Sequence, residues 1–159
     1  MVRSSRAGIC VYCGSYGIVT SDHVPPKCLF PPETRVNLIT VHACPTCHES
    51  YKLDDEYFRV ILSVRDDLPD GPEANFLRDQ TQKTLNKPAA LAFRQAIERS
   101  IIKIDRQSPD GVFQVTALKI DPLRIKRTAN RIVRGLYGNF FGHPLPKSYE
   151  LWLFVKSCG

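Results

Sequence analysis

Two Cys-x-x-Cys pairs constrain this chain more than any other feature of its sequence. The pairs are Cys10-Val11-Tyr12-Cys13 and Cys44-Pro45-Thr46-Cys47. Four thiolates with this spacing within each pair can close one tetrahedral zinc site at Cys10, Cys13, Cys44 and Cys47. The gap between the pairs exceeds the roughly 15 to 20 residues of common zinc ribbons, so a structural unit is inserted there. Two redox motifs or an iron–sulfur cluster are the alternatives, and structural zinc is the prediction.

Length and composition indicate a single domain of ordinary size. The chain has 159 residues, of which 43% are hydrophobic, so it can bury a real core. The start of the sequence lacks the apolar run of a secretory signal, and no stretch approaches the roughly 18 apolar residues of a membrane span. Six cysteines without an export signal favour a reducing compartment. We therefore expect a cytoplasmic protein with no membrane partner.

The positive charge is concentrated in the last third of the chain. The net charge is +6, and residues 111–159 contain eight Lys or Arg against two Asp or Glu. A basic surplus confined to one region suggests a surface for a polyanion, because neutralising phosphates releases their counterions. Mild basicity is also common in soluble proteins, which is the alternative. The pattern predicts nucleic acid as a partner.

Hydrophobic periodicity predicts strand, loop, strand and helix in the first half. Residues 18–20 read as a short strand that ends at Asp22-His23, and residues 38–41 read as a second strand. Prolines make residues 24–36 a stiff loop between them. A helix is expected from Pro45 to about residue 66, because proline suits the first helical turn and apolar residues then recur at helical spacing.

The second half is predicted to be mostly helical. Helices are expected at residues 70–86 and 86–108, followed by a strand at residues 112–120. Asp121-Pro122 is a strong helix start, and that helix extends to about residue 138, where two glycines loosen its end. A closing strand is expected at residues 149–155.

The helix at residues 122–138 has a basic side and an apolar side. At 100° per residue the apolar side contains Ile125, Ala129, Ile132 and Leu136. The opposite side contains Arg124, Arg127, Arg131 and Arg134. If the apolar side packs inward, four guanidinium groups would face solvent and could contact phosphate oxygens. The alternative is an ordinary solvated face.

Three short segments resemble the HNH endonuclease family, also called the ββα-metal nucleases. They are Thr20-Ser21-Asp22-His23-Val24-Pro25-Pro26, then Val36-Asn37-Leu38, and then Cys44-Pro45-Thr46-Cys47-His48. The resemblance covers about residues 10–52. It implies an α+β fold with a zinc-stapled ββα-metal (HNH) core at residues 1–67. A mostly helical C-terminal extension at residues 68–159 is expected to pack with the core as one compact unit.

The resemblance also implies a role for each residue of the centre. His23 corresponds to the general base that takes a proton from water, for which an imidazole is suited. Asp22 and His48 correspond to ligands of a catalytic divalent cation such as Mg²⁺ or Mn²⁺. Asn37 is expected to orient His23. Alternatively, His48 could replace a cysteine as zinc ligand, and Asn37 could be a turn residue.

The leading hypothesis is a metal-dependent endonuclease that hydrolyses double-stranded DNA and leaves 5′-phosphate ends, as the family does. Its cofactors would be a structural Zn²⁺ and a catalytic Mg²⁺, Mn²⁺ or other divalent cation, with no small-molecule cofactor. The second hypothesis is a non-catalytic, zinc-dependent DNA-binding module. A third is a structural protein in which zinc only stabilises a small core. The set Asp22, His23, Asn37 and His48 favours the first, because a binding module needs no base beside a carboxylate.

Overall fold

The computed structural model describes residues 6–65, 67–149, 151 and 152 of the chain, with helices and strands in an α+β arrangement. The chain divides into two compact units, which we call unit 1 and unit 2. Unit 1 comprises Met1–Arg59 and Leu123–Gly159, and unit 2 comprises Val60–Pro122. This division differs from the boundary that we drew along the sequence at residue 67, because residues from both ends of the chain form unit 1.

Unit 1 contains a three-stranded antiparallel sheet with the order β1-β2-β3. The strands are β1 (Arg6–Ile9), β2 (Tyr16–His23) and β3 (Thr40–Ala43). The predicted strand at residues 18–20 is confirmed as the middle of β2, and the second predicted strand begins later, at Thr40. Asp22 lies opposite Val41 and His23 lies opposite Thr40. The predicted catalytic pair is therefore at the C-terminal end of β2, where this strand pairs with β3.

The connection between β2 and β3 contains two short 3₁₀ turns, at Lys27–Leu29 and Pro32–Thr34. After β3, the helix that we expected to be continuous is divided at Tyr51. It forms α1 (Pro45–Ser50) and α2 (Lys52–Ser63). The predicted order of strand, loop, strand and helix is therefore confirmed.

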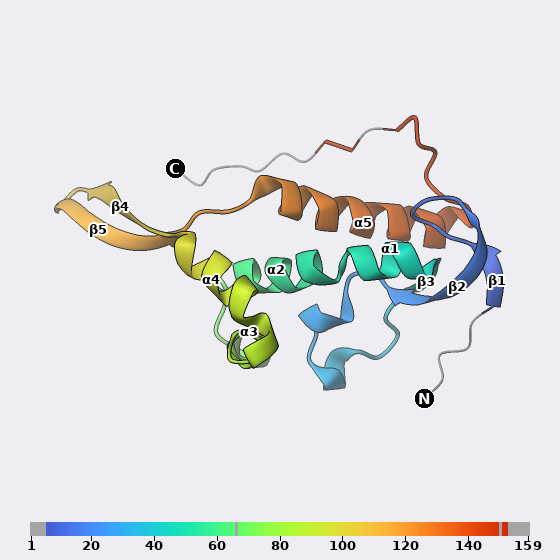
Figure 1. The fold of residues 1–159 in the computed structure, drawn as a ribbon. Helices are drawn as coiled ribbons and strands as arrows, with labels where there is room; N and C mark the ends of the chain where they lie inside the picture. Colours follow the sequence, from blue (N-terminus) through green and yellow to red (C-terminus); the bar gives the residue numbers. More distant parts are fainter. Residues whose placement is uncertain (1–5, 66, 150, 153–159) are drawn as a thin grey trace. The chain divides into compact units, whose positions relative to one another are not determined.

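Helix α5 (Pro122–Phe141) is the longest helix described and runs alongside α1 (Figure 1). The predicted start at Pro122 is confirmed, but the two glycines near its end have another role than loosening it. A Cβ at Gly135 would lie 2.5 Å from Val24 Cγ2, and one at Gly138 would lie 2.8 Å from Val11 Cγ1. Glycine at these two positions permits the close approach of α5 to Val24, which follows β2, and to Val11, in the connection between β1 and β2.

The core of unit 1 lies around the two cysteine pairs. Its buried members are Cys10, Tyr12, Val19, Val24, Val41 and Ala43. Partly buried residues from α1 and α5, including Cys47 and Ile132, pack against them. The cysteines are thus part of the packed interior, and a metal ion there would join the sheet to α1.

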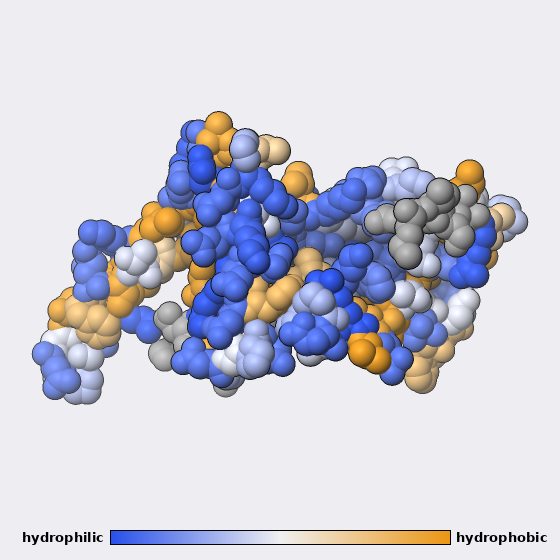
Figure 2. Space-filling model, turned by 90° about the horizontal axis from the view of Figure 1, so that it is seen from below, coloured by the Kyte–Doolittle hydropathy of each residue, from blue (hydrophilic) through white to orange (hydrophobic). Residues whose placement is uncertain are grey.

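Unit 2 contains α3 (Pro72–Leu85), α4 (Leu91–Arg99), β4 (Ile101–Ser108) and β5 (Gly111–Leu118). The predicted helix at 70–86 and the predicted strand at 112–120 are confirmed. The helix predicted for 86–108 is wrong in its second half, because residues 101–108 pair with β5 as an antiparallel hairpin. Hydrophobic side chains of this hairpin reach the surface, at the left of Figure 2.

The closing strand that we expected at residues 149–155 is wrong for Tyr149, Leu151 and Trp152, which have no regular structure. Its other residues lie outside the described part of the chain. Among the described residues, no helix combines the length and the apolar character that crossing a lipid bilayer needs.

Candidate functional site

The four cysteine thiols of the two pairs converge on one point in unit 1. Their sulfur atoms all lie within 4.8 Å of one another, and the Sγ atoms of Cys13 and Cys44 are 3.9 Å apart. Sulfurs at the corners of a tetrahedron with Zn–S bonds of about 2.3 Å are about 3.8 Å apart. The predicted cluster of Cys10, Cys13, Cys44 and Cys47 is therefore confirmed, and it could bind one zinc ion.

Hydrogen bonds shape the loop around each cysteine pair. In the first, the Gly14 N–H donates to the Cys10 carbonyl at 2.8 Å, and Gly14 has a φ of 76°, which favours glycine. In the second, the Cys47 N–H donates to the Cys44 sulfur at 3.5 Å, where helix α1 begins. Hydrogen bonds from the Ser15 side chain and backbone lower the pKa of Cys13 to about 6. This favours the thiolate form of Cys13, whereas burial raises the pKa of Cys10 and of Cys47, whose thiolates a bound zinc ion would stabilise.

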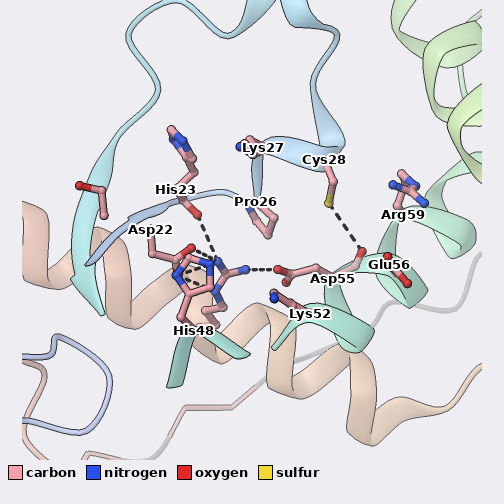
Figure 3. A pocket seen from close by; sticks show the side chains of 12 residues that line it. Asp22, His23, Pro26, Lys27, Cys28, His48, Lys52, Asp55, Glu56 and Arg59 are labelled. Carbon is pink, nitrogen blue, oxygen red and sulfur yellow. Dashed lines mark hydrogen bonds and ion pairs between the residues drawn. The ribbon is translucent and has the colours of Figure 1, made fainter. Parts of the chain in front are cut away.

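Unit 1 also has a cavity of about 540 Å³, which we call the His23 cavity. Asp22, His23 and His48 all line it, together with cationic side chains that include Lys27 and Lys52 (Figure 3). Its volume is within the range of roughly 300 to 1,000 Å³ of small-ligand sites. Three of the four residues predicted for the catalytic centre are thus brought to one cavity.

Asp22 is buried, and protein donors fill its carboxylate. Nη2 of Arg131 lies 2.7 Å from both of its oxygens, and the Tyr12 hydroxyl donates to Oδ2 at 2.8 Å. A divalent cation bound to this carboxylate would compete with these donors and would lie beside the positive charge of Arg131. The arrangement therefore does not fit the predicted sharing of a catalytic cation by Asp22 and His48 while Arg131 is bound to Asp22.

The arginines of α5 mostly face carboxylates of unit 1. Arg131 also forms an ion pair with Asp55. Nε of Arg124 lies 2.8 Å from one oxygen of Asp54, and Nε of Arg127 lies 2.7 Å from the other. The exposed fractions of the side chains are 4% for Arg131, 18% for Arg124 and 59% for Arg127.

We expected the side chains of Arg124, Arg127, Arg131 and Arg134 to form a ridge that faces solvent. That expectation is wrong, because most of these side chains are at least partly buried. Arg134 donates to the Leu145 carbonyl at 3.1 Å, which leaves Arg127 as the most exposed of these four side chains. The helical periodicity of α5 placed the arginines on one side correctly. It contained no information about the acidic residues of α2 that lie against that side.

Burial and charge act in opposite directions on this network. Burial raises the pKa of Asp55 to about 6, and the Arg131 guanidinium offsets only part of the rise. Burial opposes the charged form of Arg131, but hydrogen bonds to Asp22 and the charge of Asp55 outweigh it and raise the Arg131 pKa. Arg131 is therefore held as a buried cation between two carboxylates.

His23 is the candidate proton acceptor. Its ring points away from the Asp22 carboxylate (Figure 3), as successive side chains of a strand do. Its Nδ1 is buried and has no hydrogen-bond partner within the described ranges. Burial, followed by the charge of Lys27, lowers the pKa of His23. The imidazole is therefore neutral at neutral pH and can accept a proton.

The other two predicted residues differ in their placement. His48 lies in α1 and lines the His23 cavity, with Nδ1 3.4 Å from the Thr20 hydroxyl. The sulfur cluster has four cysteine ligands without it. Asn37 is exposed in a turn, has a φ of 61° and does not line the cavity. This geometry suits the alternative of a turn residue, because Asn tolerates left-handed backbone.

Sequence reasoning missed the acidic partners of the arginines. Asp54 and Asp55 are adjacent in the first turn of α2, which was a visible signal of a charged site. Their pairing with α5 was not visible, because 70 or more residues separate the partners along the chain. Tyr12 was read only as a spacer within the first cysteine pair, although its hydroxyl binds Asp22.

Comparisons of the chain with protein families, with curated proteins and with solved structures found no match. The structural findings thus define an α+β protein with a four-cysteine cluster that could bind zinc.

Proposed function

We propose that this chain is an endonuclease that hydrolyses phosphodiester bonds of double-stranded DNA, with His23 as general base. The observation that supports the proposal is that His23 lines one cavity with Asp22 and His48. The lowered pKa of His23 favours its neutral form, which a base requires. Lys27 and Lys52 line the same cavity and supply positive charge for phosphate oxygens.

In the proposed reaction, His23 takes a proton from water and the resulting hydroxide attacks phosphorus. The bond between phosphorus and the 3′ oxygen breaks, which leaves a 5′-phosphate and, after protonation, a 3′-hydroxyl. The negative charge that develops needs a nearby cation. The expected Mg²⁺ or Mn²⁺ at Asp22 and His48 requires that Arg131 first release Asp22, so the dependence of cleavage on divalent cations tests that part of the proposal.

The alternative function is a zinc-dependent module that binds DNA without cutting it. One observation favours it: in the described arrangement Arg131 fills the carboxylate that a catalytic cation would need. The same helix carries Arg127, whose side chain is 59% exposed and could contact a phosphate as well as Asp54. Both proposed functions use the same fold and the same zinc site. They differ in whether the protein cleaves the DNA that it binds.

Nicking of supercoiled plasmid DNA with Mg²⁺ or Mn²⁺ distinguishes the two functions. We expect wild-type protein to nick the plasmid and His23→Ala to lose nicking by a factor of about 10² or more, while zinc content and the circular dichroism spectrum persist. His143→Ala is the matched control, because His143 is exposed and lies outside the cavity. Equal nicking by wild type and His23→Ala would reject the role of His23. DNA retardation without nicking would favour the binding module.

A further inference from the structure

The β4–β5 hairpin of unit 2 is a two-stranded sheet among the described residues, and most of its residues are exposed. An isolated two-stranded hairpin is only marginally stable in water, and a third strand or a packed face is needed for independent stability. One of its faces is mostly apolar: it carries Ile102, Ile104, Phe113, Val115 and Ala117, with Arg106 opposite Phe113 toward the loop. Phe113 is 47% exposed and Ile104 is 38% exposed.

Part of this apolar face is accounted for within unit 2. Ile104, Val115 and Ala117 line a groove of about 440 Å³ together with helical residues that include Val60 and Leu85. The groove gives the base of the hairpin a packing partner. Within the part of the chain that the structure describes, no further strand pairs with either long edge of the hairpin.

The two edges differ in charge. Strand β4 carries Lys103, Asp105 and Arg106, whereas β5, from Gly111 to Leu118, contains no charged residue and no proline. Natural sheets protect free edges with charges, prolines or bulges, because an unprotected edge pairs with other chains. The edge of β5 has the composition of a strand that is paired on both sides.

The hydrogen-bond pattern shows which backbone groups this edge offers. The Lys119 N–H donates to the Ser100 carbonyl at 2.7 Å, next to the register that pairs Leu118 with Ile101. In an antiparallel ladder, the residues of a strand alternate in the side to which their backbone groups point. The odd-numbered residues of β5 therefore face β4, and the N–H and C=O groups of its even-numbered residues lie along the free edge.

We propose that β5 pairs antiparallel with β5 of a second copy of this chain, about a two-fold axis at Val115. In this register Gln114 lies opposite Thr116 of the second copy, and both are residues whose backbone groups face the edge. On the apolar face, Phe113 lies opposite the small Ala117 of the second copy, so the ring has room. The product is a four-stranded sheet in which the apolar faces of the two hairpins are continuous.

The absence of charged residues from β5 is the reason that a second copy of the same strand fits this edge. A two-fold axis brings identical residues together, so any ionised residue near the axis would face its own charge. Strand β5 has none, and the charges of β4 lie on the outer strands of the proposed sheet. The inference does not depend on the proposed nuclease function, because every residue in it belongs to unit 2.

A pair of proline substitutions tests the proposal by sedimentation or light scattering. Gln114→Pro removes an edge N–H of β5 and leaves the β4–β5 ladder intact, since Gln114 and Asp105 are a non-hydrogen-bonded pair. Asp105→Pro is the matched control, because it removes the N–H at the same level from the opposite edge. We expect wild type and Asp105→Pro to be dimers and Gln114→Pro to be a monomer. A monomeric wild type, or a dimeric Gln114→Pro, would overturn the proposal.

A charge-mixing experiment covers the case in which a proline disturbs the hairpin. One chain carries Gln114→Lys and Thr116→Lys, and the other carries Gln114→Glu and Thr116→Glu; both positions are exposed. Each chain alone places like charges across the axis and should be monomeric, whereas an equimolar mixture should form heterodimers. The register is rejected if either chain dimerises alone as well as wild type does, or if the mixture stays monomeric.

Discussion

Replacement of Arg131 by Met should destabilise the protein strongly, because it leaves two buried carboxylates without their cation. The Arg131 side chain is 4% exposed, and its partners Asp22 and Asp55 are 5% and 14% exposed. Removing one partner of a buried ion pair costs about 3 to 5 kcal/mol. For a chain of 159 residues this corresponds to a fall in Tm of roughly 6 to 20 °C.

The loss should depend on pH in a defined direction. With Arg131 in place, burial already raises the pKa of Asp55 to about 6, and removal of the guanidinium raises it further. A carboxyl whose folded pKa lies above its unfolded value stabilises the fold at low pH, and that contribution is lost as pH rises through the folded pKa. Because the unfolded state is the same for both proteins, the part of the Arg131→Met deficit that comes from Asp55 should be full above the raised pKa of the variant, shrink as pH falls toward about 6, and be absent below that pH.

Thermal or urea unfolding of three variants measures this effect. Arg127→Met is the matched control on the same helix, because its side chain is 59% exposed and Arg124 still pairs with Asp54. We expect it to cost about 1 kcal/mol or less. Adding Asp22→Asn to Arg131→Met should recover part of the loss. If Arg131→Met costs no more than Arg127→Met, or if its deficit is the same at pH 5 and pH 8, the buried network does not have the energy that we assign to it.

Two further predictions concern the metal cluster and the turn at Asn37. Cys13→Ser, or chelation, should remove one bound zinc per chain and unfold the sheet region, because the binding free energy of structural zinc in small zinc domains is about 10 to 16 kcal/mol. Cys28→Ser is the control and should keep its zinc. Equal zinc content in the two variants would contradict the assignment. If Asn37 is a turn residue with positive φ, Asn37→Gly should keep both stability and nicking, whereas Asn37→Ala should cost about 1 kcal/mol. Loss of nicking in a stable Asn37→Gly protein would restore the orienting role.

Features with a local cause could be predicted from the sequence. The spacing of each cysteine pair fixes a tight loop, so the cluster of four thiols followed from the sequence alone. The start of α5 at Pro122 followed from Asp121-Pro122, because an acidic residue before proline is typical of a helix start. In each case the residues that determine the structure are within a few positions of one another.

The hairpin shows how a local pattern can mislead. Ile101 and Ile102 continue the apolar spacing of α4, so the periodicity favoured a longer helix, and Pro109-Asp110 was read as its end. In the structure Pro109 and Asp110 form the two-residue loop between Ser108 and Gly111, and Ile101 and Ile102 belong to β4. The isoleucines are β-branched and suit a strand, and a strand that needs a distant partner cannot be distinguished from a helix by spacing alone.

The ion pair between Arg131 and Asp22 bears on two predictions, the cation site at Asp22 and the phosphate contact of Arg131. The sequence assigned Asp22 to a divalent cation and Arg131 to a DNA phosphate, but the structure pairs them with each other. Because both oxygens of Asp22 accept from Arg131, the assigned partner of each residue would compete with this pair. Separation of the pair would release both residues together, with Asp22 open to a cation and Arg131, which lines the same cavity, open to an anion. Metal binding at Asp22 and phosphate binding by Arg131 should therefore be positively coupled, since each ligand offsets the same cost of breaking the pair.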